Sequence, residues 1–344
     1  MNKIELNGMS LNELKALMID IGEKSYRGQQ VFTYFNRNNN LDIDSLIQLP
    51  KDLRKKISDL SFVNELKIYK RFDSRVDRTS KYLFQLRDDN IIESVFMQYK
   101  HGNTACISTQ IGCRMGCKFC ASTKEGLIRN LTPAEMLNQI YMMEKDTGEV
   151  ISNVVLMGSG EPLDNYDNVL KFINIIHDEN GHNISLRNIT LSTCGIIPKI
   201  YELSKENLPI TLSVSLHSPF DSERAKIMPI AKKYNISELI KACRFYERST
   251  NRRLTFEYTL IENINDTKAD LEELSRILKG FNSHVNIIPL NPIKEYDKER
   301  PIRDHVKKFQ IELLKRNIPA TIRREMGSDI SASCGQLRRS ITKV

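Results

Sequence analysis

The chain has 344 residues and a mass of 39.7 kDa, and its 51 basic and 43 acidic side chains give a formal net charge of +8. Apolar residues make up 40% and charged residues 27%, a balance that is typical of globular proteins and excludes collagenous chains. The longest uncharged apolar stretches, such as residues 208–220, are shorter than the about 20 residues of a membrane-spanning helix. The first residues lack the apolar core of a secretory signal. We therefore expect a cytoplasmic protein that is not bound to membranes.

Residues 1–62 have the pattern of a small helical domain. Ser10 can cap a helix in which Leu14, Leu17, Met18 and Ile21 recur at helical spacing. Three segments rich in β-forming residues follow and are separated by polar turns; they cover residues 66–74, 80–88 and 90–100. We expect residues 63–100 to form a short antiparallel β meander that links the helical domain to the rest of the chain.

From residue 101 onward, short apolar strands alternate with amphipathic helices. The expected strands are residues 104–109, 153–157, 188–192, 211–216, 254–260 and 284–290. The expected helices are residues 133–146, 165–178, 198–205, 236–247, 269–280 and 304–317. Such alternation is typical of a parallel sheet that helices cover. The sequence therefore predicts an α/β fold in which residues 101–344 form a partial (β/α)₆ barrel with a C-terminal tail.

Three of the seven cysteines, Cys113, Cys117 and Cys120, form a C-x3-C-x2-C pattern just after the first expected strand of this barrel. Seven cysteines in a long cytoplasmic chain favour metal, cluster or catalytic thiols over structural disulfides. No second pair of Cys or His follows at the spacing typical of zinc sites. Three thiolates that leave one iron open suit a [4Fe–4S] cluster. A zinc knuckle and three unrelated buried thiols are the alternatives.

The cluster pattern and several further motifs resemble those of one enzyme family. The motifs are CRMGCKFC, MGSGEPLDN, LSTCGIIP, SLHSP, MPI, LNP, the terminal SCGQLR and the N-terminal GEKSYRGQQVFTYF. Together they cover nearly the whole chain and resemble the RlmN/Cfr group of radical S-adenosylmethionine (SAM) RNA methyltransferases. The resemblance implies a radical SAM barrel, a [4Fe–4S] cluster held by the three cysteines, and SAM bound at the open iron.

Polar residues stand at the ends of successive expected strands, where α/β barrels bind their ligands. The resemblance implies that SAM is held at these strand ends by the polar residues and their neighbours. The residues concerned are Gly160, Glu161, Ser192, Ser215, Leu216, His217 and Asn291. Gly160 permits close approach of the backbone, and Glu161 can accept a hydrogen bond from the SAM amine. Taken alone, each residue is more readily explained as a capping or turn residue, but their shared placement at successive strand ends favours a ligand site.

Cys334 lies in a short polar tail, whereas buried structural cysteines usually have apolar neighbours. The resemblance implies that a first SAM methylates Cys334, and that a second SAM yields a radical that takes hydrogen from this methyl group. The methylene radical adds to adenine, and Cys106 attacks the sulfur, forms a transient disulfide and releases the methylated base. Glu93 matches the family's proposed proton acceptor; its alternative is a solvated strand carboxylate. The chemistry is consistent, because adenine C2–H is not reactive enough for polar methyl transfer.

The sequence departs from the family at three positions of these motifs. Ser159 stands where Met is frequent, Ser331 where Asp is usual and Ser333 where Ala is usual. Cys194 and Cys243 match no functional position, and we interpret both as structural.

The resemblance implies 23S rRNA and tRNA as substrates and methylation at adenine C2. Residues 301–344 carry ten basic and four acidic side chains. Possible phosphate contacts are Arg54, Lys55, Lys56, Arg323, Arg324, Arg338 and Arg339. We expect a monomer that receives electrons from a flavodoxin-type protein. Two alternatives stay open: methylation at C8, although Pro162 resembles the C2 branch, and a non-catalytic iron–sulfur protein that binds RNA or senses redox state.

Overall fold

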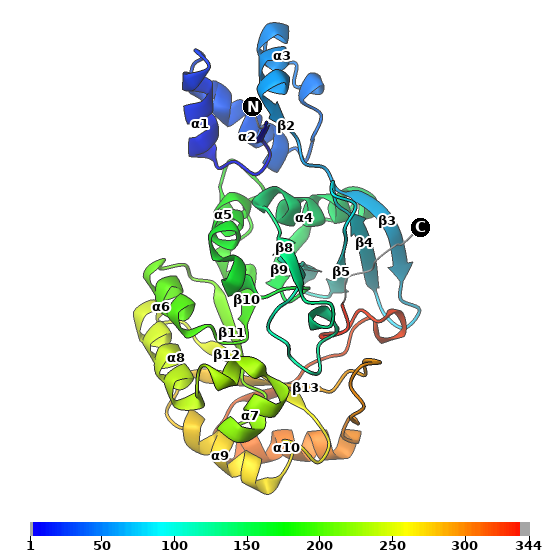
Figure 1. The fold of residues 1–344 in the computed structure, drawn as a ribbon, viewed down its shortest axis with the longest axis vertical. Coiled ribbons are helices and arrows are strands. Elements are labelled where there is room, and N and C mark those ends of the chain that lie inside the picture. Colours follow the sequence, from blue (N-terminus) through cyan, green and yellow to red (C-terminus); the bar gives the residue numbers. More distant parts are fainter. Residues whose placement is uncertain (1–2, 338–344) are drawn as a thin grey trace.

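The computed structural model describes residues 3–337, and its N-terminal part is a small helical domain at one end of the molecule (Figure 1). Its elements are β1 (Ile4–Glu5), α1 (Leu11–Asp20), α2 (Tyr26–Asn36), α3 (Lys51–Leu60) and β2 (Ser61–Phe62). Ser10 and Glu13 form the capping box that starts α1. The short strands β1 and β2 pair in parallel and bring the two ends of the domain together. The sequence pattern did not reveal this pairing, because strands of two residues carry no periodicity.

The rest of the chain forms one ten-stranded sheet with the order β14-β13-β12-β11-β10-β9-β6-β5-β4-β3. Its strands are β3 (Lys67–Asp73), β4 (Thr79–Gln85), β5 (Ile91–Tyr99), β6 (Gly102–Cys106), β9 (Ile151–Leu156), β10 (Ile189–Thr193), β11 (Thr211–Ser215), β12 (Leu254–Leu260), β13 (Ser283–Pro289) and β14 (Ala320–Ile322). Strand β6 and the strands β9 to β14 are parallel, and they form the predicted partial barrel. Strands β3, β4 and β5 are antiparallel, as the meander predicts.

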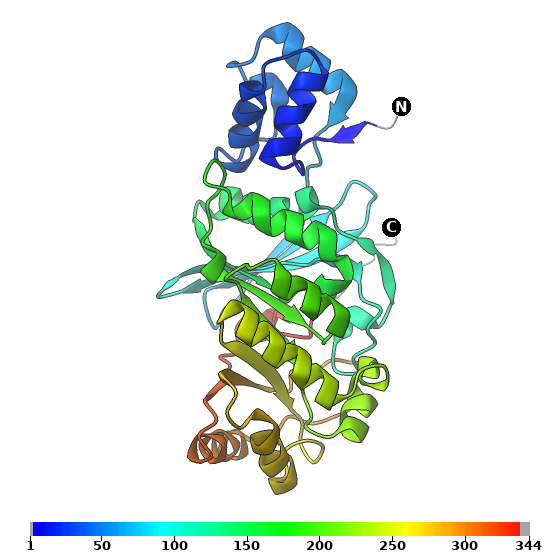
Figure 2. The ribbon, with the colours of Figure 1, turned by 90° about the vertical axis from the view of Figure 1, so that its left-hand side faces the viewer.

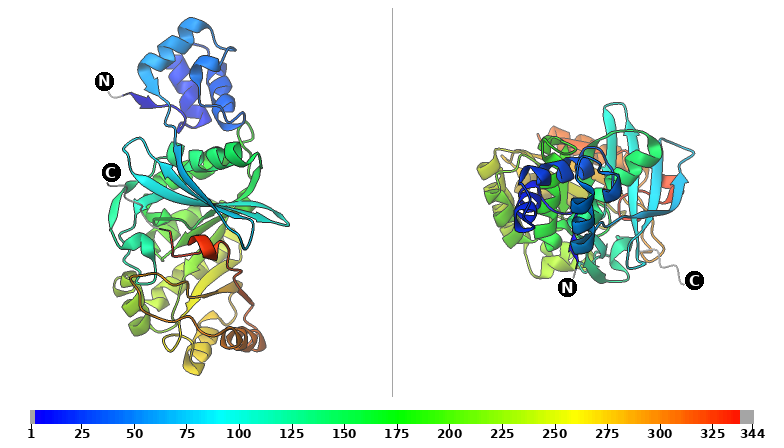
Figure 3. Two further views of the ribbon diagram at one scale, coloured as in Figure 1. Left: turned by 90° about the vertical axis from the view of Figure 1, so that its right-hand side faces the viewer. Right: turned by 90° about the horizontal axis from the view of Figure 1, so that it is seen from above.

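The meander continues the barrel sheet, because β5 pairs with β6 over residues 95–106 (Figure 3). A small second pair, β7 (Gln110–Gly112) and β8 (Leu127–Asn130), flanks the cysteine loop. The expected linker is therefore an extension of the barrel's edge. The sequence pattern could not show this, because pairing between distant strands leaves no local signal.

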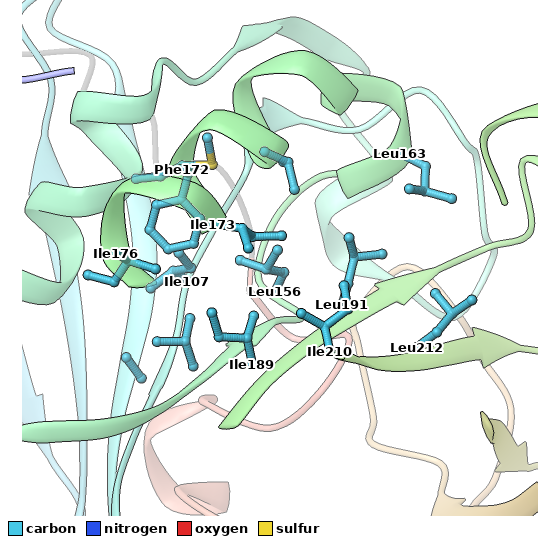
Figure 4. Packing of buried hydrophobic residues seen from close by; sticks show 14 of the residues in the cluster. Ile107, Leu156, Leu163, Phe172, Ile173, Ile176, Ile189, Leu191, Ile210 and Leu212 are labelled. Atoms are coloured by element: carbon cyan, nitrogen blue, oxygen red, sulfur yellow. The ribbon is translucent and has the colours of Figure 1, made fainter. Parts of the chain in front are cut away.

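Helices cover the outer face of the parallel strands (Figure 2). They are α4 (Pro133–Thr147), α5 (Tyr166–His177), α6 (Ile197–Lys205), α7 (Asp221–Ile227), α8 (Ile236–Thr250), α9 (Lys268–Leu278) and α10 (Arg303–Lys315). Phe172, Ile173 and Ile176 of α5 pack over Leu156 and Ile189 of the sheet (Figure 4). Burial of such side chains contributes about 1.5–3 kcal/mol each. The packing of the helices on the sheet fixes the positions of the strand ends, and with them the candidate site.

Contacts from both sides fix the helical domain on α4 and α5. Asn36 accepts a hydrogen bond from Tyr141 of α4 at 3.0 Å, and Lys171 of α5 forms an ion pair with Glu13 at 2.7 Å. The buried Asn36–Tyr141 contact contributes more than the exposed ion pair, because water screens the latter. Within residues 3–337, no helix is long and apolar enough to cross a membrane.

Candidate active site

The cysteine loop follows β7 and borders a cavity at the carboxyl ends of the barrel strands. Cys113, Cys117 and Cys120 all line this cavity. Gly112 has a φ of +74°, and a Cβ there would collide with the carbonyl oxygen of Gly126. The loop therefore needs glycine at position 112 to turn back on itself.

Hydrogen bonds within the cysteine loop and from the loop to α7 also hold it in place. The Thr123 hydroxyl donates to the carbonyl oxygens of Cys117 and Cys120 at 3.0 Å each. The backbone N–H of Lys118 donates to the carbonyl of Ile227 at the end of α7, at 2.9 Å. The positions of the cysteines are therefore set by the backbone of the loop.

The three thiols fit a soft metal cluster by their chemistry. Burial raises the pKa of Cys113 to about 12 and also raises the pKa values of Cys117 and Cys120. A cationic iron centre offsets this cost by stabilising the thiolates. No three His, Cys, Asp or Glu side chains in residues 3–337 gather tightly enough to hold one metal ion. A [4Fe–4S] cluster differs from such an ion because each thiolate binds a different iron.

Gly160 and Glu161 follow β9 and line the same cavity. Gly160 has a φ of +109°, and a Cβ there would lie 2.7 Å from the Cβ and 2.8 Å from the N of Gln110. The buried Glu161 carboxylate accepts the N–H groups of Leu163 at 3.0 Å and Cys194 at 2.7 Å. Burial raises its pKa, and these donors act in the opposite direction. A carboxylate oxygen can accept a further hydrogen bond, so Glu161 can still receive an amine of a ligand.

The ends of β10 and β11 add further groups to the cavity. Ser192, Ser215 and His217 line it, whereas Leu216 is fully buried beneath it and does not. The Nδ1 of His217 accepts the N–H of Thr259 at 2.8 Å, and burial lowers the pKa of His217 to about 3. His217 is therefore a neutral imidazole that carries its proton on Nε2. Its ring packs edge-on against the ring of Phe119 in the cysteine loop, with 4.8 Å between the two ring centroids.

Arg224 of α7 was not among the expected site residues. Its side chain is 1% exposed and donates to the carbonyl oxygens of Cys194 at 2.9 Å, Ser215 at 3.0 Å and Leu216 at 3.1 Å. Arg224 thereby holds the ends of β10 and β11 together under the cavity. Cys194, which we interpreted as structural, directly follows β10 and also lines the cavity. Only the fold brings α7 to these carbonyls, so no sequence motif marked it.

The C-terminal tail crosses the cysteine loop and places Cys334 at the cavity (Figure 1). The N–H of Ala121 donates to the carbonyl of Gly335 at 2.7 Å, and the Ser122 hydroxyl donates to the carbonyl of Leu337 at 2.6 Å. Asn291, after β13, donates from its side chain to the carbonyl of Cys334 at 3.0 Å. Asn291 also lines the cavity, so it is placed to contact both a ligand and the tail.

Cys106 and Cys334 share a second hollow next to the first, and both are unbridged thiols in this structure. Burial is the largest cause that raises the pKa of each thiol, for Cys106 to about 12. Arg323 lines both hollows, and its positive charge acts against this rise at each sulfur. The guanidinium lies 3.7 Å from the buried carboxylate of Glu257.

The positive charge of Arg323 favours the thiolate forms of the buried Cys106 and the half-buried Cys334, and so acts against the effect of burial. Arg323 was expected as one of the phosphate contacts; in the structure it lines both hollows of the site. Glu257 was not singled out, because it lies within a β strand, and strand periodicity does not separate a ligand from a core residue.

Glu93 of β5 is also buried, but it lines a different hollow from the two thiols. Lys81, Lys294, Ser331 and Gln336 are among its neighbours there. The Nζ of Lys81 lies 3.8 Å from a carboxylate oxygen of Glu93. The solvated-carboxylate alternative therefore does not describe Glu93, whose side chain is 4% exposed.

The remaining basic residues are distributed unevenly. Arg54 donates to the carbonyl of Asp44, and Lys56 donates to the carbonyl of Ile21 at 2.5 Å, so both side chains are engaged within the helical domain. Lys55 and Arg324 are exposed. Arg338 and Arg339 lie outside the described residues.

Comparison with known proteins agrees with this geometry. Residues 107–276 match the Radical SAM superfamily, and residues 4–63 match the family described as the ribosomal RNA large subunit methyltransferase N-terminal domain. A protein from Clostridioides difficile named "Probable dual-specificity RNA methyltransferase RlmN" is 51% identical, with 98% of each chain covered. The chain belongs to the RlmN family of radical SAM RNA methyltransferases.

Two further relatives of RlmN type or fold extend this result. A protein from Lachnoclostridium phytofermentans with the same RlmN name is 50% identical over 99% of this chain and 96% of its own. The crystal structure of a radical SAM methyltransferase from Sphaerobacter thermophilus is 40% identical, covers 97% of this chain and 99% of its own, and superimposes with a TM-score of 0.92. The expected fold class is thereby confirmed, and the protein is an RNA-methylating enzyme. Its family implies SAM and a [4Fe–4S] cluster, and the thiols and polar strand ends of the cavity fit both.

Proposed function

We propose that the enzyme methylates C2 of adenine in 23S rRNA and tRNA through an S-methylated Cys334, with two SAM molecules consumed per turnover. The observation that carries this proposal is the position of Cys334. It lines the cavity of the cysteine loop and also the hollow of Cys106, with Arg323 shared by both. A thiol in this position can receive a methyl group on one side and a second thiol on the other.

The first half of the reaction needs Cys334 as a thiolate, because the thiolate is the nucleophile that takes a methyl group from SAM. Arg323 stabilises that thiolate, and Asn291 fixes the backbone of the tail. Cys113, Cys117 and Cys120 would hold the cluster, and Glu161 would receive the SAM amine. When bound, the cluster would supply the electron that cleaves a second SAM to methionine and a 5′-deoxyadenosyl radical, and this radical would take a hydrogen atom from the S-methyl group.

The second half releases the base. Once the methylene radical is bonded to C2 of adenine, Glu93 accepts the C2 proton in the hollow next to the tail. The unpaired electron of the adduct also has to leave, and the oxidised cluster would accept it, so that the adenine ring is aromatic again before the thiols react. The Cys106 thiolate attacks the Cys334 sulfur, so that an S–S bond forms and the S–CH₂ bond breaks. The electron pair of that bond goes to carbon, which is protonated to a methyl group. Reduction of the disulfide by two electrons then restores both thiols.

The names of the relatives and the domain order support the proposed substrates. The relatives are named dual-specificity RNA methyltransferases, and the helical domain matches a ribosomal RNA methyltransferase domain. We assign RNA binding to residues 1–62, the link to residues 63–100 and the chemistry to residues 101–344. The exposed Lys55 and Arg324 would neutralise phosphates. We further propose a cytoplasmic monomer that receives electrons from a flavodoxin-type protein.

The experiment that tests the proposal uses the anaerobically reconstituted enzyme with SAM, a reductant and an unmodified 23S rRNA fragment. The nucleosides are then identified by mass spectrometry against standards. We expect 2-methyladenosine, and no methylated base from the Cys334→Ala variant. The appearance of 8-methyladenosine would move the reaction to C8 and keep the role of the thiols. Methylation by Cys334→Ala at the wild-type rate would refute the covalent scheme. An intact cluster without methylation of rRNA or tRNA would favour the non-catalytic alternative.

A further inference from the structure

Lys81 of β4 is a buried lysine that has no role in the reaction proposed for this enzyme. Its side chain is 11% exposed, and its Nζ lies 3.8 Å from Oε1 of Glu93, which is 4% exposed. The Phe72 ring of β3 covers the ammonium, with 5.4 Å between Nζ and the ring centroid. Lysine is seldom buried unless it is paired, so this placement calls for a reason.

Lys81 also contacts the tail that carries Cys334. Its Nζ donates to the carbonyl of Ser331 at 3.4 Å. Ser331 adopts a left-handed backbone with a φ of +52°, three residues before Cys334. The turn of β3 and β4 holds the same stretch of tail through Asp77, which accepts the N–H of Gly327 at 2.9 Å. One ammonium therefore contacts both the proposed base and the tail of the methyl carrier.

We propose that Lys81 is a positioning residue that keeps Glu93 ionised and ties it to the Cys334 tail. Burial disfavours a carboxylate, and a protonated Glu93 could not take a proton from the base. An opposite charge at this distance favours the ionised form. Among residues 3–337, Lys294 is a further charged side chain that lines the hollow with Glu93 and Lys81. It provides a matched control with the same change of charge.

This inference rests on the proposed role of Glu93, and the test separates the two. Enzyme whose Cys334 is already methylated is mixed with SAM, reductant and the rRNA fragment. The RNA–protein adduct and the released methylated RNA are then quantified on denaturing gels between pH 6 and 9. The variants are Lys81→Met, Lys81→Arg, Lys294→Met and Glu93→Gln.

We expect Lys81→Met to release product at least about tenfold more slowly at neutral pH, and to recover as the pH rises by about one unit. The adduct should accumulate meanwhile, because its formation does not need the base. Lys81→Arg should restore most of the rate, and Lys294→Met should behave like the wild type.

Two results would overturn the role of Lys81. The first is wild-type release by Lys81→Met while Glu93→Gln stalls at the adduct. The second is a parallel loss of adduct and product without a pH shift, which indicates only a structural role. Wild-type release by Glu93→Gln would instead remove Glu93 from the proposed function itself.

Discussion

Replacement of Arg224 by Met should destabilise the enzyme and weaken SAM binding together. The change removes the Arg224 donor from the carbonyl oxygens of Cys194, Ser215 and Leu216. The Leu216 carbonyl keeps the N–H of Ser218 at 2.8 Å, so the loss falls on Cys194 and Ser215. An unsatisfied buried acceptor costs about 1–3 kcal/mol. Burial lowers the pKa of Arg224, so part of this cost is offset when the buried charge is removed. We therefore expect a net loss of about 3 kcal/mol in the free energy of unfolding.

Urea titration of the anaerobically reconstituted enzyme measures this loss, and equilibrium dialysis measures SAM binding. Arg276→Met is the matched control, because Arg276 of α9 is exposed and pairs only with the neighbouring Glu273 in the described structure. It should change neither quantity noticeably. Equal stability losses in Arg224→Met and Arg276→Met would show that the carbonyl contacts do not hold the strand ends.

Three further changes test other parts of the site. Gly160→Ala should weaken SAM binding at least about tenfold in a dialysis assay, because the new Cβ meets Gln110 and φ is +109°; unchanged binding would contradict this. The unfolded state should bind more protons than the folded state between the pKa of about 3 and the ordinary 6.5 of His217. Stability should therefore fall as the pH falls through this range, by up to about 1.4 kcal/mol per pH unit. His217→Asn, whose Oδ1 can still accept the Thr259 N–H, should unfold with a shallower pH dependence; an equal slope would refute the assignment. Methylation of Cys334 by SAM should accelerate with pH between 7 and 9, because burial raises the pKa of this thiol and only the thiolate reacts. Mass spectrometry of the protein measures the rate of methylation, and a rate that does not change with pH would argue against the raised pKa.

Local sequence patterns predicted most of the fold. Strands β6 and β9 to β13 of the barrel and the helices α4, α5, α6, α8, α9 and α10 were expected from periodicity, because a half-buried helix and a buried strand each leave a repeating pattern of apolar residues. Helix α7 was not expected, because its seven residues are too few to show a stripe. The meander was predicted as three strands, but its union with the barrel through β5 and β6 depends on long-range pairing.

The short motifs of the chain were enough to predict the kind of chemistry that this protein carries. The spacing of Cys113, Cys117 and Cys120 and the polar strand ends were readable because motif residues lie close together in the chain or end successive strands. The tertiary structure alone decided which distant groups share a site. It brought Arg323 into one hollow with Cys106 and Cys334, joined Arg224 to two strand ends, and placed Glu93 beside Lys81. These groups meet because sheet pairing and helix packing join segments far apart in the chain, and the burial that follows sets their charges.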